Sequence, residues 1–309
     1  MSLSLNFKIL IDDSFINIAT DKSLNPIDKK NVLSVINDFE DKKWRYKNFQ
    51  NFIWDNVAET SLSYNERESL IDSSHSLLTA AAQNLRLTDK IGDISKGSEL
   101  AEIALYGIMK HHYNALPVVP KIFYKQNVQD NAKGADSVHI VIESDYTFSI
   151  WLGEAKFYNS IDDARFDVIV ESIENALVTD KLKKENSIIT NVSDIDGLIT
   201  DVELRKKIKL ALNGRKSIDD LKPILHIPIL LLHECAITNK CISLSDDYKA
   251  EITDLHKVKA ETYFKKQLTK LSAVNKYASI TFHLILFPVP SKEAIVNSFL
   301  STANFYKNS

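Results

Sequence analysis

The sequence predicts an α/β fold in which helices flank a mixed sheet, preceded by a mainly helical N-terminal region. Short runs rich in β-branched and aromatic residues recur in the second part of the chain, and amphipathic segments separate several of them. We expect strands at residues 118–124, 134–142, 148–156, 224–232 and 280–287. The 309 residues are 44% hydrophobic with only 7 Gly and 7 Pro, which excludes a disordered or fibrous protein.

The N-terminal region, residues 1–88, is expected to hold mainly helices and to bind a partner. Residues 2–18 alternate apolar and polar side chains, which predicts one or two strands. A helix with apolar residues along one side is expected over residues 28–39, and a further helix is expected near residues 63–85. A domain boundary is expected after this second helix, so that residues 89–309 form the second domain.

Aromatic residues concentrate in the segment 44–56, which predicts either a packed helix or a surface that binds a partner. Aromatic side chains at helical spacing belong to a protein core more often than to an interface. A buried helix is therefore the first interpretation, and a partner surface is the alternative. The residues concerned are Trp44, Phe49, Phe52, Ile53 and Trp54.

The second domain begins with an expected helix over residues 96–108, which has Ser98 available as a cap and Glu99 in its first turn. The positive end of the helix dipole favours an acid at this position, and the acid can also point toward the sheet that the helix covers. Further helices are expected over residues 162–184, 202–212, 247–271 and 292–305.

Two of the expected strands form a hairpin in which Ile142 faces Phe148. This register places Asp136 opposite Glu154 at the far end of the hairpin. Directly opposed residues hold their Cβ atoms about 5 Å apart, close enough for two carboxylates to share one cation. Lys156 lies on the same face, because side chains alternate along a strand. Two acids and a lysine therefore meet at one end of an apolar sheet face.

Such a group suits metal-assisted hydrolysis of a phosphodiester. Carboxylate oxygens favour Mg²⁺ or Mn²⁺, and Mg²⁺ keeps several waters while it binds a substrate phosphate. The ion polarises the phosphoryl oxygen and lowers the pKa of a bound water. Lys156 can orient the attacking water, accept its proton or offset negative charge. The alternative without chemistry is a salt bridge at the end of a hairpin, since acid–lysine pairs are common.

The order of these segments resembles the PD-(D/E)xK nuclease superfamily, whose core is a mixed sheet flanked by helices. Within that superfamily, three motifs resemble the HamA family (DUF1837), which supplies the effector nuclease of the Hachiman anti-phage defence system. The motifs are Gly97-Ser98-Glu99, Gly134-Ala135-Asp136 and Gly153-Glu154-Ala155-Lys156-Phe157-Tyr158. The resemblance covers roughly residues 90–300 and is weak before Asp89. Ala135 stands where the superfamily name has Pro, at a position that carries no ligand side chain.

The resemblance implies a metal-dependent deoxyribonuclease. Asp136 and Glu154 would bind Mg²⁺ or Mn²⁺ together with the backbone carbonyl of Ala155, and Lys156 would act on the water. Glu99 would be a further acid beside these ligands or at a second metal. The resemblance also implies broad degradation of DNA and a helicase partner, the HamB subunit, that restrains the nuclease. The aromatic segment of the N-terminal region is the candidate contact for this helicase.

Two alternatives stay open, a catalytically inactive scaffold with a nuclease fold and a site-specific restriction endonuclease. A degenerate site usually loses one of its residues, whereas Glu154, Lys156 and the matching Asp136 are all present. A restriction enzyme needs a domain that reads a DNA sequence, and the chain shows no such segment. Both observations favour the broad nuclease.

The formal net charge of −3 gives the chain no overall positive field that attracts nucleic acid. Local basic groups are therefore the candidates for DNA contact, and for those within the expected helix 202–212 a solvated helix face is the default interpretation. The candidates are Lys133, Arg165, Arg205, Lys206 and Lys207. The chain has neither an N-terminal signal pattern nor an apolar run near 18 residues, so we expect a cytoplasmic protein that does not enter a membrane.

Overall fold

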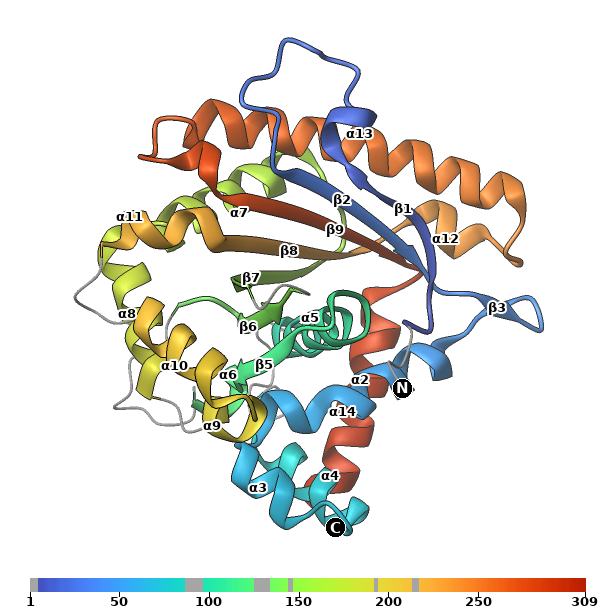
Figure 1. Ribbon diagram of the computed structural model, residues 1–309. Helices are drawn as coiled ribbons and strands as arrows, with labels where there is room; N and C mark the ends of the chain where they lie inside the picture. Colours follow the sequence, from blue (N-terminus) through green and yellow to red (C-terminus); the bar gives the residue numbers. More distant parts are fainter. Residues whose placement is uncertain (1–4, 87–96, 125–133, 144–146, 192–193, 213–216) are drawn as a thin grey trace.

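Seven strands of the chain form one mixed sheet. The computed structural model describes residues 5–86, 97–124, 134–143, 147–191, 194–212 and 217–309, which Figure 1 shows as coloured ribbon. The strand order is β1-β2-β9-β8-β7-β6-β5, and a separate two-stranded ribbon joins β3 to β4. The strands are β1 (Lys8–Ser14), β2 (Lys30–Ile36), β3 (Phe39–Glu40), β4 (Lys43–Trp44), β5 (Leu116–Val119), β6 (Ser137–Ile142), β7 (Phe148–Tyr158), β8 (Leu225–Glu234) and β9 (Thr281–Val289).

The centre of the sheet is parallel and its two edges are antiparallel. β2, β9, β8 and β7 run in one direction, whereas β1 pairs antiparallel with β2, and β6 with β7. Almost every residue of β8 and β9 is buried, as expected for parallel strands covered on both faces. The strands expected over residues 224–232 and 280–287 are thus confirmed.

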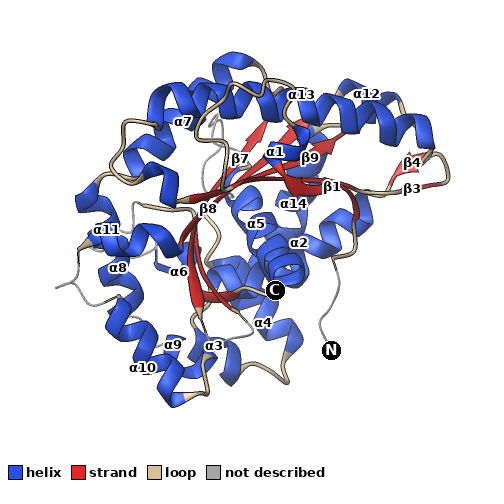
Figure 2. Ribbon diagram, turned by 45° about the horizontal axis from the view of Figure 1, so that its top comes forward, coloured by secondary structure: helices blue, strands red, loops and turns tan. Residues whose placement is uncertain are grey.

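Helices cover both faces of the sheet, and each face has its own apolar core (Figure 2). One face is covered mainly by α7 (Asp163–Ala176), α8 (Thr179–Asn191) and α13 (Asp246–Leu271), and the other by α2 (Tyr46–Ser61), α4 (Ser74–Gln83), α5 (Ser98–Tyr113) and α14 (Lys292–Lys307). Shorter helices are α1 (Phe15–Ile18), α3 (Tyr64–Ser69), α6 (Lys121–Tyr124), α9 (Asp194–Leu198), α10 (Val202–Ala211), α11 (Ile218–Leu221) and α12 (Ala236–Lys240). The predicted class, a mixed α/β sheet flanked by helices, is confirmed.

The helix expected over residues 28–39 is wrong, because this segment contains strand β2. Val32 packs into the core of one sheet face, whereas Leu33 and Val35 pack into the core of the other. A strand between two partners buries consecutive residues on both faces, and a short apolar run of this kind cannot be told from a buried helix by spacing alone. The N-terminal region is accordingly less helical than expected, since it supplies both β1 and β2.

Residues 44–56 include the end of β4 and most of helix α2, and the aromatic side chains of this segment pack within the protein. Phe49 and Ile53 are fully buried, and Trp44 is 4% exposed. Trp54 packs against Phe299 and Tyr306 of α14, with ring centroids 5.3 Å apart in both pairs. The packed helix is therefore confirmed. The helicase contact expected of this segment stays a prediction, although core packing already uses most of these aromatic faces.

Residues on both sides of the expected domain boundary belong to the same sheet, and they pack together in the core of each sheet face. β2 pairs with β9 in parallel register, with Val32 opposite Leu284. Helix α2 packs against α5, and residues of both helices belong to the core of the same sheet face. The boundary itself falls within residues 87–96, which lie outside the described part of the chain.

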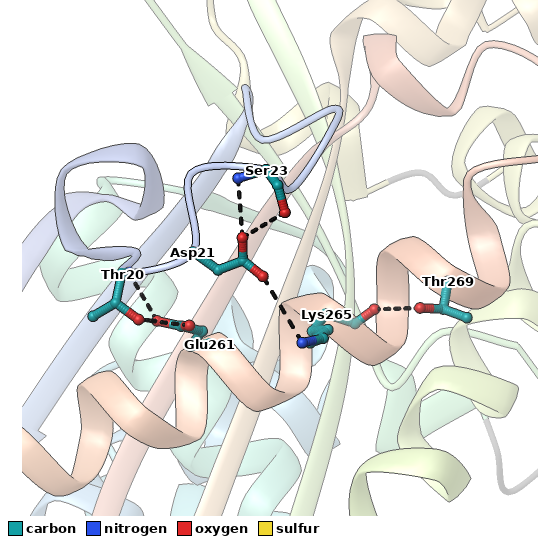
Figure 3. Close-up of polar contacts among 6 residues, drawn as sticks. All are labelled: Thr20, Asp21, Ser23, Glu261, Lys265 and Thr269. Carbon is teal, nitrogen blue, oxygen red and sulfur yellow. Dashed lines mark hydrogen bonds and ion pairs between the residues drawn. The ribbon is translucent and has the colours of Figure 1, made fainter.

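The connection from α1 to β2 also lies against the second half of the chain (Figure 3). Thr20 donates its backbone N–H to Glu261 of α13 at 2.9 Å and its hydroxyl to the same carboxylate at 2.7 Å. Asp21 accepts a hydrogen bond from Ser23 and lies 3.8 Å from the ammonium of Lys265. These contacts hold the connection between α1 and β2 on the long helix α13.

Several other helices and strands differ from the expected ones in their bounds or are divided in two. The helix expected over residues 63–85 is divided into α3 and α4, and that over residues 162–184 is divided into α7 and α8. The strand expected over residues 118–124 is shorter and continues into α6. The expected helices within residues 202–212, 247–271 and 292–305 are confirmed as α10, α13 and α14. Among the described residues, no helix combines the length and apolar character that crossing a membrane requires.

Candidate functional site

The hairpin of β6 and β7 has the predicted register. Val138 faces Leu152 and Ile142 faces Phe148, in antiparallel pairing. Strand β6 begins at Ser137, so Asp136 lies immediately before it and donates its backbone N–H to the carbonyl of Gly153 at 2.8 Å. Asp136 is thereby held beside β7 at the point where β6 starts.

Asp136, Glu154 and Lys156 come together as predicted. The ammonium of Lys156 lies 2.6 Å from Oε1 of Glu154 and 3.7 Å from Oδ2 of Asp136. The same oxygen of Asp136 accepts the backbone N–H of Ala155 at 3.1 Å. The Asp136 side chain thus occupies the position next to β7 that a continuing β6 backbone would otherwise fill. Two carboxylates and an ammonium therefore share one end of the hairpin.

Helix α7 covers this group and adds a hydroxyl. Ser172 donates its Oγ–H to Oε1 of Glu154 at 2.7 Å. Sequence reasoning missed Ser172, although the apolar stripe of the helix carried a signal. Ile169 and Ile173 are buried toward the sheet, and a residue three positions after Ile169 lies on the same helix face.

Burial and the neighbouring charges shift the pKa values of the group. Burial raises the pKa of Glu154 above its ordinary value, and the charge of Asp136 raises it further, against the opposing effects of Lys156 and Ser172. Burial alone would lower the pKa of Lys156, but the charges of Asp136 and Glu154 outweigh it and the pKa is raised. Lys156 is therefore an ammonium at neutral pH. The charge of Asp136 still disfavours ionisation of Glu154, so a further cation beside the two carboxylates would be stabilised.

Glu99 lies in the first turn of α5, as predicted, and is buried. Its two carboxylate oxygens lie 3.1 and 3.0 Å from the backbone nitrogen of Arg86. The N-cap is Gly97, not the expected Ser98, and its φ of 106° lies in the left-handed region that glycine tolerates. A Cβ on Gly97 would lie 3.0 Å from Phe157, so α5 begins beside the residue that follows Lys156. The role of Glu99 toward Asp136 and Glu154 stays a prediction.

Cationic side chains from both faces of the sheet flank the end of β7. The guanidinium of Arg165 lies over the ring of Tyr158, 5.2 Å from its centroid. Lys292, at the start of α14, donates its ammonium to the carbonyl of Phe157 at 2.8 Å. Burial lowers the pKa of Lys292, and the charge of Arg165 lowers it further. Sequence reasoning missed Lys292, because it lies more than a hundred residues after β7.

The other basic candidates lie away from this group. Lys206 and Lys207 line a groove with Thr147 and Phe148, at the turn end of the hairpin. A strand rises about 3.3 Å per residue, so the six steps from Phe148 to Glu154 span about 20 Å. Arg205 donates to the carbonyl of Asp196 at 2.9 Å, and Lys206 pairs with Glu203 at 2.8 Å. Lys133 lies outside the described residues.

The residues at the end of the hairpin fit a hard divalent cation. The carboxylates of Asp136 and Glu154 lie together, and burial and the charge of Asp136 raise the pKa of Glu154. Mg²⁺ is commonly bound by one or two carboxylates and completes its shell with water and substrate oxygens. Among the described residues, no group of three or more His, Cys, Asp or Glu side chains is placed to hold a metal ion.

The sequence was also compared with known protein families. Residues 12–303 match the HamA family. The chain belongs to the HamA family. This membership associates the protein with the Hachiman defence system. The match begins within β1 and includes β2, well before the segment where the motifs resembled the family most. Comparison with curated proteins gives no match.

Proposed function

We propose that this HamA-family protein is a Mg²⁺- or Mn²⁺-dependent nuclease that hydrolyses the phosphodiester bonds of DNA. One observation carries the proposal, the convergence of Asp136, Glu154 and Lys156 at the end of β7. A salt bridge alone gives no account of a second carboxylate brought to the same ammonium. Together with the mixed sheet and the helices on both its faces, this arrangement supports a PD-(D/E)xK nuclease fold.

Asp136 and Glu154 are the proposed metal ligands, and the carbonyl of Ala155 is the third. In a β-strand the N–H and C=O of one residue point to the same side. The N–H of Ala155 points to Asp136, so its carbonyl faces the same edge, where β6 has not yet begun. These three oxygens are hard ligands, and a metal bound to them would polarise the scissile phosphate and acidify a water.

Lys156 is proposed to hold the attacking water and to offset charge on the phosphate. Its raised pKa keeps the ammonium protonated, so it donates hydrogen bonds and cannot accept a proton while both neighbouring carboxylates are charged. The hydroxyl of Ser172 and the ammonium both lie on Oε1 of Glu154, which orients that carboxylate. Orientation of ligands by such neighbours supports metal affinity and activity.

Arg165 and Lys292 are proposed to bind the DNA backbone on either side of the scissile phosphate. They approach the end of β7 from opposite faces of the sheet, within electrostatic reach of each other. Two like charges at the end of β7 attract a phosphate chain, which the overall net charge of −3 does not. Arg205, Lys206 and Lys207 lie near the far end of the hairpin and would contact only a longer stretch of nucleic acid.

As an effector of Hachiman defence, such a nuclease must be restrained in the bacterial cytoplasm. The proposed partner is the helicase subunit of the system, HamB, which would release the nuclease when invading or damaged DNA is sensed. The buried aromatic residues of α2 are not available for this contact. The helicase is therefore proposed to bind another surface of the protein.

Cleavage of supercoiled plasmid tests the proposed function. Purified protein, with and without the helicase, is incubated with plasmid DNA in Mg²⁺, in Mn²⁺ and in EDTA. Nicking and degradation that require the metal are expected. Discrete fragments would support a restriction endonuclease instead, and equal cleavage in EDTA would exclude the metal mechanism. A protein that leaves plasmid intact under every condition would be a scaffold.

A further inference from the structure

The two residues before Asp136 lie against a buried ion pair that the proposed chemistry does not use. Glu185 of α8 and Lys121 of α6 meet with Oε2 and Nζ 2.7 Å apart, and their side chains are only 6% and 0% exposed. The other carboxylate oxygen of Glu185 accepts the backbone N–H of Ala135 at 3.1 Å. Both oxygens of a buried acid are thus engaged, one by a cation and one by the chain next to Asp136.

Gly134 shows how closely this segment approaches Glu185. A Cβ added at Gly134 would overlap Oε1 of Glu185, with the carboxylate carbon directly behind it. Any larger residue must therefore displace either the carboxylate or the segment. The glycine of the Gly134-Ala135-Asp136 motif is thus explained by contact with a residue of another helix, without any direct part in chemistry.

A buried ion pair is a weak source of stability. Removing charges from water is costly, and replacing a buried pair with apolar residues of similar size is often neutral or stabilising. What the pair does specify is geometry. It fixes where Ala135 lies, and Asp136 follows by one peptide bond.

We propose that Glu185 is a positioning residue for Asp136, with Lys121 orienting its carboxylate. Glu185 holds the N–H of Ala135 from one side, while the carbonyl of Gly153 holds the N–H of Asp136 from the other. Between these two anchors, the Asp136 side chain is directed at Ala155 and Lys156. This inference rests on the proposed function, because it gives Glu185 a purpose only if Asp136 binds a metal.

Two matched double variants of the full chain separate positioning from burial of charge. Lys121→Met/Glu185→Gln removes both charges and retains an oxygen that accepts the N–H of Ala135. Lys121→Met/Glu185→Leu also removes both charges, and it removes the acceptor as well. The readouts are Mn²⁺ affinity by titration calorimetry, thermal unfolding without metal, and plasmid cleavage.

The Leu variant is expected to bind Mn²⁺ about tenfold more weakly or worse, because partners of metal ligands commonly contribute this much. The Gln variant is the conservative rescue and is expected to restore most of the affinity. Equal Mn²⁺ affinity of the two folded variants overturns the inference. An unmodified chain that binds no Mn²⁺ overturns the proposed function itself, and the inference falls with it.

If the Leu variant does not fold, Gly134→Ala decides the question with the ion pair intact. The added methyl displaces either the carboxylate of Glu185 or the segment that carries Ala135, so a loss of Mn²⁺ affinity is expected in the folded variant. Mn²⁺ affinity equal to that of the unmodified chain would overturn the positioning role.

Discussion

The backbone N–H of Ala155 donates a hydrogen bond to Oδ2 of Asp136 at 3.1 Å. An acid from the chain before β6 thereby replaces a backbone partner in the ladder of β7. The ladder opens at this point, and the opening brings a carboxylate to Glu154 and Lys156. The site is thus built where a strand begins, which allows a charged group to enter an otherwise apolar sheet face.

Replacing Lys156 with methionine is expected to lower plasmid cleavage by about a hundredfold or more. Methionine retains the apolar stem and removes the ammonium, and the loss of one stabilising donor at a reacting group commonly has an effect of this size. Initial rates on supercoiled plasmid, in saturating Mg²⁺, measure the change.

Lys249→Met is the matched control for Lys156→Met. Lys249 also follows an acid by two residues, but it lies on α13 and pairs with Asp246 at 2.8 Å. Its removal should leave cleavage unchanged. If both variants retain full activity, Lys156 takes part only in a salt bridge.

Glu154→Gln is expected to weaken both Mn²⁺ binding and cleavage. The substitution removes one negative charge at nearly constant shape, and the affinity of hard cations depends on ligand charge. Titration calorimetry with Mn²⁺ gives the affinity, and Ca²⁺ should bind the unmodified protein without supporting turnover. Unchanged Mn²⁺ affinity in the variant would remove Glu154 from the ligand set.

The raised pKa of Glu154 predicts how the stability of the metal-free protein changes with pH. Above the ordinary pKa of 4.5 and up to the raised value, the folded protein retains a proton that the unfolded chain releases. The free energy of unfolding contributed by this group therefore falls as the pH rises through that window. Lys156 adds no slope there, since its pKa is raised and it stays charged.

Urea unfolding in EDTA, from pH 4.5 upward, compares the unmodified protein with Glu154→Gln. The unmodified protein should lose stability relative to the variant as the pH rises. A stability difference that is constant across this range would mean that Glu154 is not shifted.

Arg165→Ala and Lys292→Ala are each expected to weaken DNA binding and to reduce its salt dependence. Each phosphate contact contributes about 0.9 to the slope of log affinity against log salt concentration. Binding to a DNA duplex too short to reach Lys206 is measured by fluorescence anisotropy in a Lys156→Met background, in which cleavage is slow. Lys206→Ala is the control, because Lys206 already pairs with Glu203 away from the site. Equal losses for all three variants would point to nonspecific attraction.

Removing residues 1–88 is expected to abolish cooperative folding of the rest. The truncation takes away β1, β2 and the whole of helix α2, which leaves an edge of β9 and a face of α5 uncovered. Circular dichroism and thermal unfolding of the fragment measure the result. A fragment that unfolds in a sharp transition would show that residues 89–309 form an independent domain.

The hairpin could be predicted because its alternation fixes both register and face, and a shift of one residue would have reversed every side chain. Strand β2 could not be predicted, because its apolar residues pack into the cores of both sheet faces and therefore follow neither a helical nor an alternating period. The contacts of Glu185 and Ser172 with the site could not be predicted from the sequence either. Each residue lies on a helix that follows β7 in the sequence, and it contacts the site only because that helix packs against the sheet. The spacing of residues in a sequence does not predict such contacts.

The pairing of β2 with β9 joins segments about 250 positions apart, such as Val32 and Leu284. Contacts this distant in sequence close slowly, and none can form before the later segment exists. A chain that has been synthesised only to a point before β9 can therefore pair β2 with β1 alone. The sheet that carries the proposed site is therefore completed only after β9 has been synthesised, long after β1 and β2.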